Sequence, residues 1–218
     1  MLTVCDFIKS MPEDISLEDF CEGITRKIRS VYKEKGIDTA ALREEPANRM
    51  TASAVIFSRS KRQIWLVGDC QCLIDGVLHD NPKPYEKEIA SRRAMIIREA
   101  LAAGTSVEEI RKNDIGRKAI LPVLKEACSR QNILYPVIDG FQIPTQKVKA
   151  VQIGDGEHEI VLASDGYPKL LPTLAESEEE LHRLLLDDPL CINENIATKG
   201  LSEGQTSFDD RSYIRFLA

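Results

Sequence analysis

EIVLASDG, residues 159–166, is the stretch of sequence that decides the fold of this chain. The apolar, β-branched run from Ile160 to Ala163 predicts a buried strand. Asp165 and Gly166 end it abruptly, because Asp-Gly is a typical turn pair. The strand therefore places a carboxylate at its end.

The same arrangement occurs at two other places in the chain. The run Ile64–Val67 is followed by Gly68-Asp69, and the acidic pair Asp209-Asp210 precedes the apolar run Tyr213–Phe216. Three such carboxylates can converge on one edge of a sheet, and Mg²⁺ is usually held by a few carboxylates plus water. A metal site at this edge is one interpretation, and ordinary turns are the other.

Composition limits the class of protein. A chain of 218 residues can bury a substantial core, so we expect one domain over residues 1–218, with two domains left open. The net charge is −6 (29 basic and 35 acidic residues), which gives no global attraction for nucleic acid or anionic membranes. A phosphorylated substrate would need local cations.

The lack of a recognisable secretory signal in the given sequence and the spacing of the cysteines predict a cytoplasmic protein. Residues 1–11 lack a basic region followed by a long apolar run, so they do not resemble a secretory signal. No apolar segment is long enough to span a bilayer. The six cysteines are scattered without zinc-site spacing, and reduced structural thiols are expected.

The first half of the chain is predicted to contain one strong helix and a hairpin. Ser16 begins a helix over Leu17–Tyr32, whose apolar residues recur at helical spacing. Ala52–Ser58 and Gln63–Val67 are β-rich and separated by a short basic turn, so they predict a hairpin, which Cys72–Ile74 extends.

The second half is predicted to begin with helices and end with strands. Helices are expected over Tyr85–Ala103, Ile115–Arg130 (interrupted or kinked at Pro122) and Ser177–Leu186. The expected strands are Tyr135–Ile138, Lys147–Ile153, Glu159–Ala163 and Ser212–Phe216. Because strands and helices do not alternate regularly, this order favours a layered α+β fold with largely antiparallel sheets.

Taken together, the three acidic strand ends resemble motifs of the protein phosphatase 2C (PP2C) family of metal-dependent phosphatases. Ile64–Cys70, IWLVGDC, resembles the family's "vanvGDS" strand, and EIVLASDG resembles its "lilASDG" strand. SFDDRSYIRF, residues 207–216, resembles the closing strand with its Asp-Asp or Asp-Asn pair. The resemblance runs from about Thr51 to the C-terminus, with the motifs in the family's order.

The resemblance implies a PP2C-like four-layer α-β-β-α sandwich that lacks the family's first strands. It also implies Mg²⁺ or Mn²⁺ as cofactor, held by Asp165 and Asp209 as core ligands with Asp69 at an additional position. In the family, a water that bridges two metal ions attacks phosphorus. A phosphoserine or phosphothreonine phosphoprotein would then be the substrate.

Two departures from the family pattern bear on activity. The family's Gly-Asp-Ser-Arg becomes Gly-Asp-Cys70-Gln71 here, which removes a cation. The family's Asp-Gly-His-Gly-Gly block, with its bridging aspartate, has no counterpart, and by family layout it would fall before Met1. The pair Glu22-Gly23 lies inside a predicted helix instead.

Two functional hypotheses therefore remain. One is a metal-dependent serine/threonine phosphoprotein phosphatase whose site is incomplete, with weak activity or none. The other is a non-catalytic, phosphatase-like module that binds a protein partner. The sequence leaves open whether the chain is an enzyme. Lys87, Arg92 and Arg93 are expected on a solvated helix face rather than at a phosphoryl group.

Overall fold

The computed structural model describes residues 2–218. The helices there are α1 Leu2–Ser10, α2 Leu17–Glu34, α3 Thr39–Glu44, α4 Glu86–Ala102, α5 Val107–Lys112, α6 Ile115–Cys128 and α7 Leu174–Asp187, with short 3₁₀ helices η1 Pro46–Asn48 and η2 Thr145–Lys147. The strands are β1 Ala54–Ser58, β2 Gln63–Val67, β3 Gln71–Ile74, β4 Val77–Asp80, β5 Lys149–Gln152, β6 Glu159–Ala163 and β7 Tyr213–Leu217.

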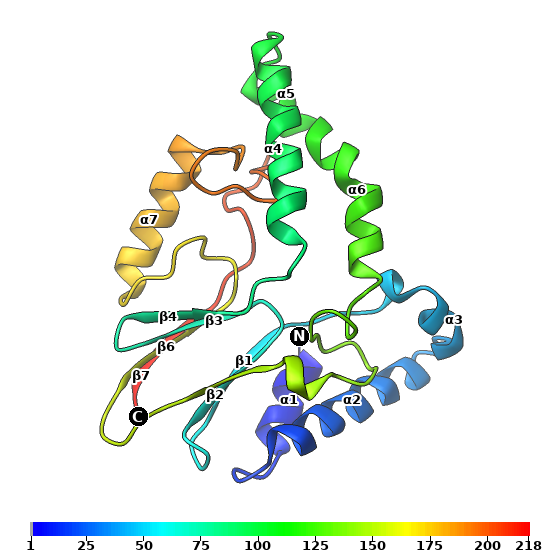
Figure 1. The fold of residues 1–218 in the computed structure, drawn as a ribbon, viewed down its shortest axis with the longest axis vertical. Helices are drawn as coiled ribbons and strands as arrows, with labels where there is room; N and C mark the ends of the chain where they lie inside the picture. Colours follow the sequence, from blue (N-terminus) through cyan, green and yellow to red (C-terminus); the bar gives the residue numbers. More distant parts are fainter. Residues whose placement is uncertain (1) are drawn as a thin grey trace.

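The strands form two antiparallel sheets. One sheet has the order β1-β2-β5 and the other has the order β4-β3-β6-β7. The chain is thus a mixed α/β protein, as the order of its elements predicts, with the sheets in the lower part of the view in Figure 1.

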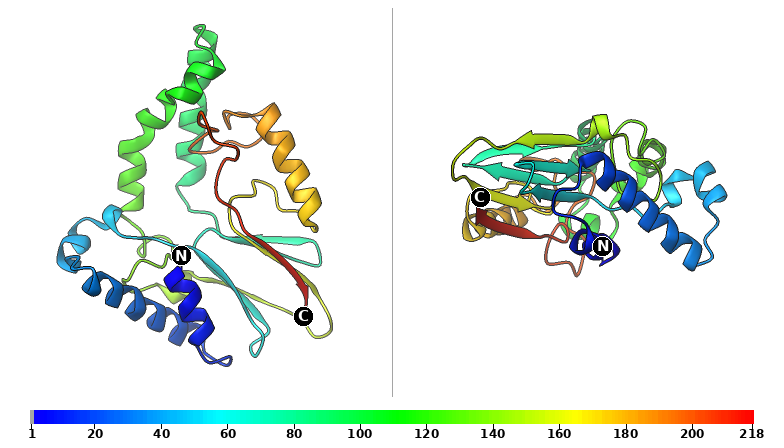
Figure 2. Two further views of the ribbon diagram at one scale, coloured as in Figure 1. Left: turned by 180° about the vertical axis from the view of Figure 1, so that it is seen from behind. Right: turned by 90° about the horizontal axis from the view of Figure 1, so that it is seen from below.

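Alternation along β2 separates two hydrophobic clusters. Trp65 and Val67 belong to a buried cluster that α1 and α2 complete, whereas Ile64 and Leu66 belong to a cluster shared with the second sheet. Successive side chains of a strand point to opposite faces, so β2 has helices on one face and the second sheet on the other. The right panel of Figure 2 shows the two sheets and the helices beside them from below.

β6 has the same alternation in the second sheet. Ile160 and Leu162 pack toward the first sheet, whereas Val161 and Ala163 belong to a cluster with residues of α7. The packing order is helix, sheet, sheet, helix, which is compatible with the expected α+β sandwich.

α4 and α6 form an antiparallel helical pair that rises away from the sheets, joined by α5 at the far end (Figure 1). Ser106 and Glu109 form a complete capping box at the start of α5. The expected interruption at Pro122 is absent, because α6 is continuous from Ile115 to Cys128, although Pro122 cannot donate a backbone hydrogen bond there.

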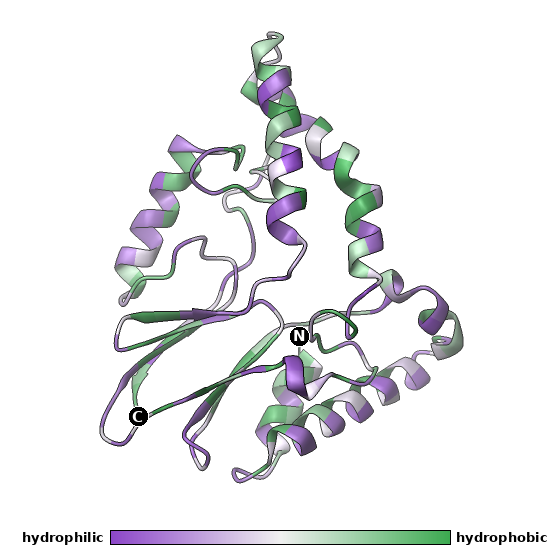
Figure 3. Ribbon diagram, viewed as in Figure 1, coloured by the Kyte–Doolittle hydropathy of each residue, from purple (hydrophilic) through white to green (hydrophobic). Residues whose placement is uncertain are grey.

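The predicted helix over Leu17–Tyr32 is confirmed as α2. The Ser16 hydroxyl accepts a 3.0 Å hydrogen bond from the Asp19 backbone N–H, which caps the first turn. Buried residues recur along one face of α2, and Figure 3 shows its alternating hydrophilic and hydrophobic colouring.

Several predicted strands differ from the structure. Tyr135–Ile138 is irregular and contributes only isolated bridges, because the side chains of Asn132 and Asp139 satisfy nearby backbone N–H groups in place of a ladder. The predicted strand Lys147–Ile153 is shorter, since its start belongs to η2. α1, α3 and β4 were not expected from the sequence pattern.

The grouping of strands into sheets also differs from the grouping expected from their order in the sequence. β3 pairs with β6 in the second sheet rather than extending the β1–β2 hairpin, and β5 pairs with β2. Each sheet therefore combines strands from both sides of the helical segment. No helix in residues 2–218 has the length and apolar character needed to cross a membrane.

Candidate functional site: an acidic group at one end of the sheets

Strand register places the predicted acidic segments at the same end of the second sheet. Gln71 of β3 pairs with Ala163 of β6, so Asp69 precedes one antiparallel strand and Asp165 follows the other. Ala163 also pairs with Tyr213 of β7. The segment containing Asp209 therefore approaches the same end.

The turn after β6 packs directly against the segment before β7. The Ser212 N–H donates a 3.0 Å hydrogen bond to the Ser164 hydroxyl, which gives Ser164 a structural role. A Cβ atom on Gly166 would lie 2.3 Å from the Asp210 carbonyl oxygen. Glycine is required here because the two backbones approach so closely.

Asp69 is buried and both of its carboxylate oxygens are engaged. Oδ1 accepts a 2.6 Å hydrogen bond from the Ser53 hydroxyl, and Oδ2 forms an ion pair with Lys83. Burial by itself would raise the pKa of Asp69, but the Lys83 charge and the hydrogen bonds from Lys83 and Ser53 outweigh it and lower the pKa. Asp69 is thus held as a carboxylate.

Lys83 is held as an ammonium by the same pair. Burial acts to lower the pKa of Lys83, but the charge and hydrogen bond of Asp69 outweigh burial and raise the pKa. The Lys83 side chain is 25% exposed, so most of it lies inside the protein.

Asp165 lies in the electrostatic field of two other carboxylates, Asp69 and Asp209. Desolvation raises its pKa to about 6, and the charges of Asp69 and Asp209 act in the same direction, partly opposed by Lys83. The residue itself is exposed by accessible area, so water screens part of these effects. Burial is the largest cause of this shift, and the charge of Asp69 adds more to it than the charge of Asp209.

Asp209 lies at the exposed side of this group. Its Oδ2 pairs with Lys199 at 2.6 Å, and its Oδ1 accepts the Asp210 backbone N–H at 3.0 Å. Asp209 and Asp210 also line a cleft of about 490 Å³, in which Arg211 pairs with Glu178 at 2.6 Å.

As placed, the carboxylates do not fit a shared pair of divalent cations. In residues 2–218, no group of three or more His, Cys, Asp or Glu side chains is arranged to hold a metal ion. Asp69 and Asp209 are each paired with a lysine, and a bound cation would have to displace these ammonium groups. The assignment of Mg²⁺ or Mn²⁺ to Asp165, Asp209 and Asp69 stays a prediction.

Lys83 and Gln71 are the residues whose roles the sequence pattern did not indicate. Lys83 lies in an irregular segment between two prolines, where no periodicity signals its direction. Gln71 donates hydrogen bonds to the carbonyls of Ser164 (3.1 Å) and Tyr167 (2.7 Å). Gln71 therefore fixes the turn containing Asp165, while Lys83 supplies a cation from another segment.

The raised pKa of Asp165 predicts a specific pH dependence. A carboxyl whose pKa is higher in the folded protein stabilises the fold below its ordinary value of 3.8, and this contribution is lost as the pH rises through about 6. The free energy of unfolding of Asp165→Asn, measured in urea, should therefore increase relative to wild type between pH 4 and pH 7. Parallel profiles for Asp165→Asn and the surface control Asp155→Asn would contradict this.

Comparisons with known proteins give one structural similarity. No family model matches the chain, and no curated protein matches it in sequence. A solved structure described as "PppA, a key regulatory component of T6SS in Pseudomonas aeruginosa" is similar with a TM-score of 0.42 and 15% identity. The similarity covers 99% of this chain and 77% of that one, and at this level it carries no argument about function.

Proposed function

We propose that the chain is a PP2C-like domain that acts by binding a protein partner rather than by hydrolysing phosphate esters. The chain retains the three carboxylates that match the family motifs, but it pairs two of them with its own lysines, Asp69 with Lys83 and Asp209 with Lys199. Under this proposal, the helix–sheet–sheet–helix packing corresponds to the family's four-layer sandwich without its first strands.

The observation that carries the proposal is the environment of Asp69. Its side chain is only 9% exposed, and Ser53 and Lys83 occupy its two oxygens. A divalent cation at Asp69 would have to displace Lys83 or lie beside a second positive charge, and both are unfavourable where water is largely excluded. The lysine therefore does electrostatically what a metal ion does in the family.

The alternative proposal, a weak metal-dependent phosphatase, makes a different prediction in an activity assay. In Mn²⁺ with a phosphoserine peptide, we expect phosphate release by wild type to equal that of Asp165→Ala and Asp209→Ala within the error of the measurement. A two-metal mechanism needs ligands that hold both ions and position the attacking water, and this arrangement does not supply them. Turnover that Asp165→Ala and Asp209→Ala abolish, but Asp155→Ala does not, would establish the enzyme instead.

Replacing Lys83 tests whether the lysine takes the place of a cation. In Lys83→Met, Asp69 and Asp165 lose their shared positive neighbour, so Mn²⁺ should bind about tenfold more tightly than to wild type. Isothermal titration calorimetry measures this directly, and the exposed Lys87→Met is the matched control. Equal Mn²⁺ affinity in wild type and Lys83→Met would contradict the proposal.

The same titrations test the type of metal. Because the candidate ligands are carboxylates without a histidine or thiolate cluster, any binding should be to Mg²⁺ or Mn²⁺ and weak. Tight Zn²⁺ binding without a response to Mg²⁺ or Mn²⁺ would count against the assignment of these aspartates.

A further inference from the structure

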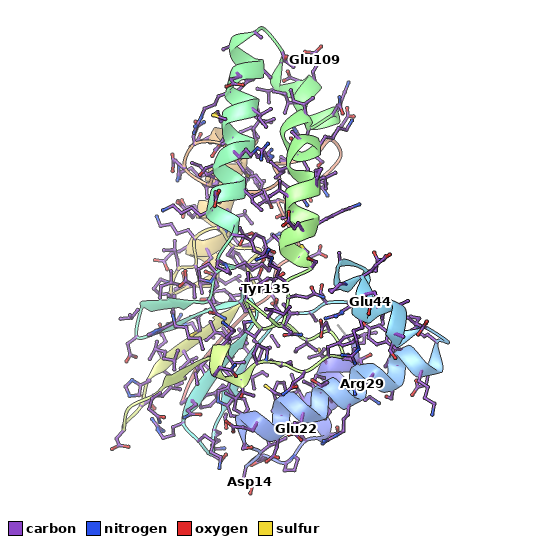
Figure 4. All side chains as sticks on the ribbon, turned by 45° about the vertical axis from the view of Figure 1, so that its right-hand side comes forward. Asp14, Glu22, Arg29, Glu44, Glu109 and Tyr135 are labelled. Carbon is purple, nitrogen blue, oxygen red and sulfur yellow. The ribbon has the colours of Figure 1, made fainter. Side chains whose placement is uncertain are left out.

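A second polar cleft, of about 840 Å³, lies away from the acidic group. Its walls come from α2, from the segment of α3 and η1, and from the loop that follows α6 (Figure 4, where Glu22 and Arg29 mark α2 and Glu44 marks α3). None of its lining residues contributes to the acidic group. Any function of this cleft is therefore separate from that site.

Arginines dominate the charge of the cleft. Arg26, Arg29, Arg43 and Arg49 line it, opposed by Glu18 and Glu22. A surplus of positive charge in an acidic protein is notable because the chain as a whole has a net charge of −6. The surplus is local, and it favours an anionic ligand at this position.

These arginines differ in how many hydrogen bonds and ion pairs they form within the chain. Arg49 is committed, since it donates to the Leu42 carbonyl at 2.8 Å and pairs with buried Asp139 at 3.0 Å. Arg43 makes no side-chain hydrogen bond or ion pair with the described residues, although its guanidinium lies 5.5 Å from the Phe141 ring centroid. Arg43 is thus free to bind a ligand.

The two arginines on α2 are also largely available. Arg29 donates its Nε–H to the Gly140 carbonyl at 3.3 Å, which leaves the two terminal nitrogens of its guanidinium without a described partner. Arg26 pairs with Glu22 at 3.3 Å, but both side chains are more than 70% exposed. An exposed pair of this kind is worth little and is readily exchanged for another carboxylate.

The floor of the cleft is closely packed. Phe141 is buried beneath the Arg49 guanidinium, which lies 3.7 Å from the ring centroid. Gly140 has a φ of +83°, and a Cβ there would lie 2.7 Å from the Tyr32 ring. The loop is therefore packed closely on α2, which fixes the backbone beneath the cleft and the position of Arg49.

The positive surface extends beyond this cleft. A neighbouring cavity of about 530 Å³ shares Arg26 and Arg29 with it and adds Lys33, opposed by one carboxylate, Asp38. These three residues are spaced by three and four positions, so they lie along one face of α2. The cationic surface is elongated, which suits an extended chain better than a compact anion.

We propose that this arginine-lined cleft binds an acidic polypeptide segment. Carboxylates of the segment would pair with Arg26, Arg29 and Arg43, and guanidinium–carboxylate pairs of this kind form strong, directional hydrogen bonds. The side-chain amides of Gln142 and Gln146 also line the cleft and can hydrogen-bond to a peptide backbone. Nucleic acid is less suitable, because a long polyanion would meet the net negative charge of the rest of the protein.

Fluorescence anisotropy of the full chain with a short labelled peptide of alternating glutamate and serine tests the proposal. We expect binding that weakens as salt is raised, and no binding of the peptide in which glutamine replaces glutamate. Arg43→Glu and Arg26→Glu should each weaken binding about tenfold. Neither side chain contributes to buried structure, so both variants should keep the wild-type circular dichroism.

Lys27→Glu is the matched control for these variants. It makes the same charge change on α2, next to Arg26, but Lys27 lines neither cavity. Its affinity for the glutamate peptide should equal that of wild type. Equal weakening by Lys27→Glu, binding of oligothymidylate as tight as that of the peptide, or no binding of the glutamate peptide would each overturn the proposal.

Discussion

Replacing Asp139 with alanine is expected to lower the free energy of unfolding by about 3 to 5 kcal/mol, since it breaks a buried ion pair and leaves one charge without a partner. Asp139 is fully buried. Its oxygens accept hydrogen bonds from Arg49 Nη1 (3.0 Å), Gln131 Nε2 (3.1 Å), Asn132 Nδ2 (2.7 Å) and the Phe141 backbone N–H (2.9 Å). All four donors would lose their acceptor at Asp139 at once, and Gln131 would keep only the Pro46 carbonyl.

Urea denaturation followed by the fluorescence of Trp65, the only tryptophan, measures this loss. Asp139→Asn keeps the shape of the side chain and one acceptor oxygen. Its free energy of unfolding should therefore lie between those of wild type and Asp139→Ala. The exposed Asp155→Ala should change the free energy of unfolding by less than about 0.5 kcal/mol. A loss for Asp139→Ala as small as this control would show that the network around Asp139 contributes little.

Replacing Arg93 with alanine is the second change with a large expected effect, again about 3 to 5 kcal/mol. Arg93 lies on α4 with no exposed surface. Its guanidinium pairs with Asp114 at 2.7 Å and donates to the carbonyls of Leu190 (2.8 Å) and Ala197 (3.1 Å). The variant would remove the charged partner of Asp114 and the donor to two carbonyls, and it would open a cavity.

Arg92→Ala is a closely matched control, because Arg92 is the neighbouring residue of α4 but is exposed. Its free energy of unfolding should stay within about 0.5 kcal/mol of wild type. Hydrogen exchange adds a local measurement: Arg93→Ala should increase exchange in residues 188–201, the loop that Arg93 holds. Equal effects of Arg92→Ala and Arg93→Ala would contradict this role.

Arg93 also corrects the expectation that Lys87, Arg92 and Arg93 share a solvated helix face. Lys87 and Arg92 are exposed, whereas Arg93 is fully buried. The sequence pattern could not reveal this difference, because the carbonyl groups that satisfy Arg93 come from a loop about a hundred residues later. Burial of a charge depends on partners, and distant partners have no local signal.

The local elements were largely determined by the sequence. Glu159–Ala163 is β6 with the predicted bounds, and Ser16 caps α2 as expected. Apolar periodicity, turn residues and caps act over a few neighbouring residues, so they can be read directly from the chain. The carboxylates at the strand ends followed from the same local patterns.

Only the tertiary structure decided which of these elements meet. β3 pairs with β6 rather than with the predicted hairpin, and this pairing places Asp69 and Asp165 at one end of the sheet. Lys83, from an irregular segment, forms an ion pair with Asp69, and its charge lowers the pKa of Asp69. The choice of sheet partner and the formation of a buried ion pair depend on contacts between residues that are far apart in the sequence. Local sequence patterns therefore do not reveal them.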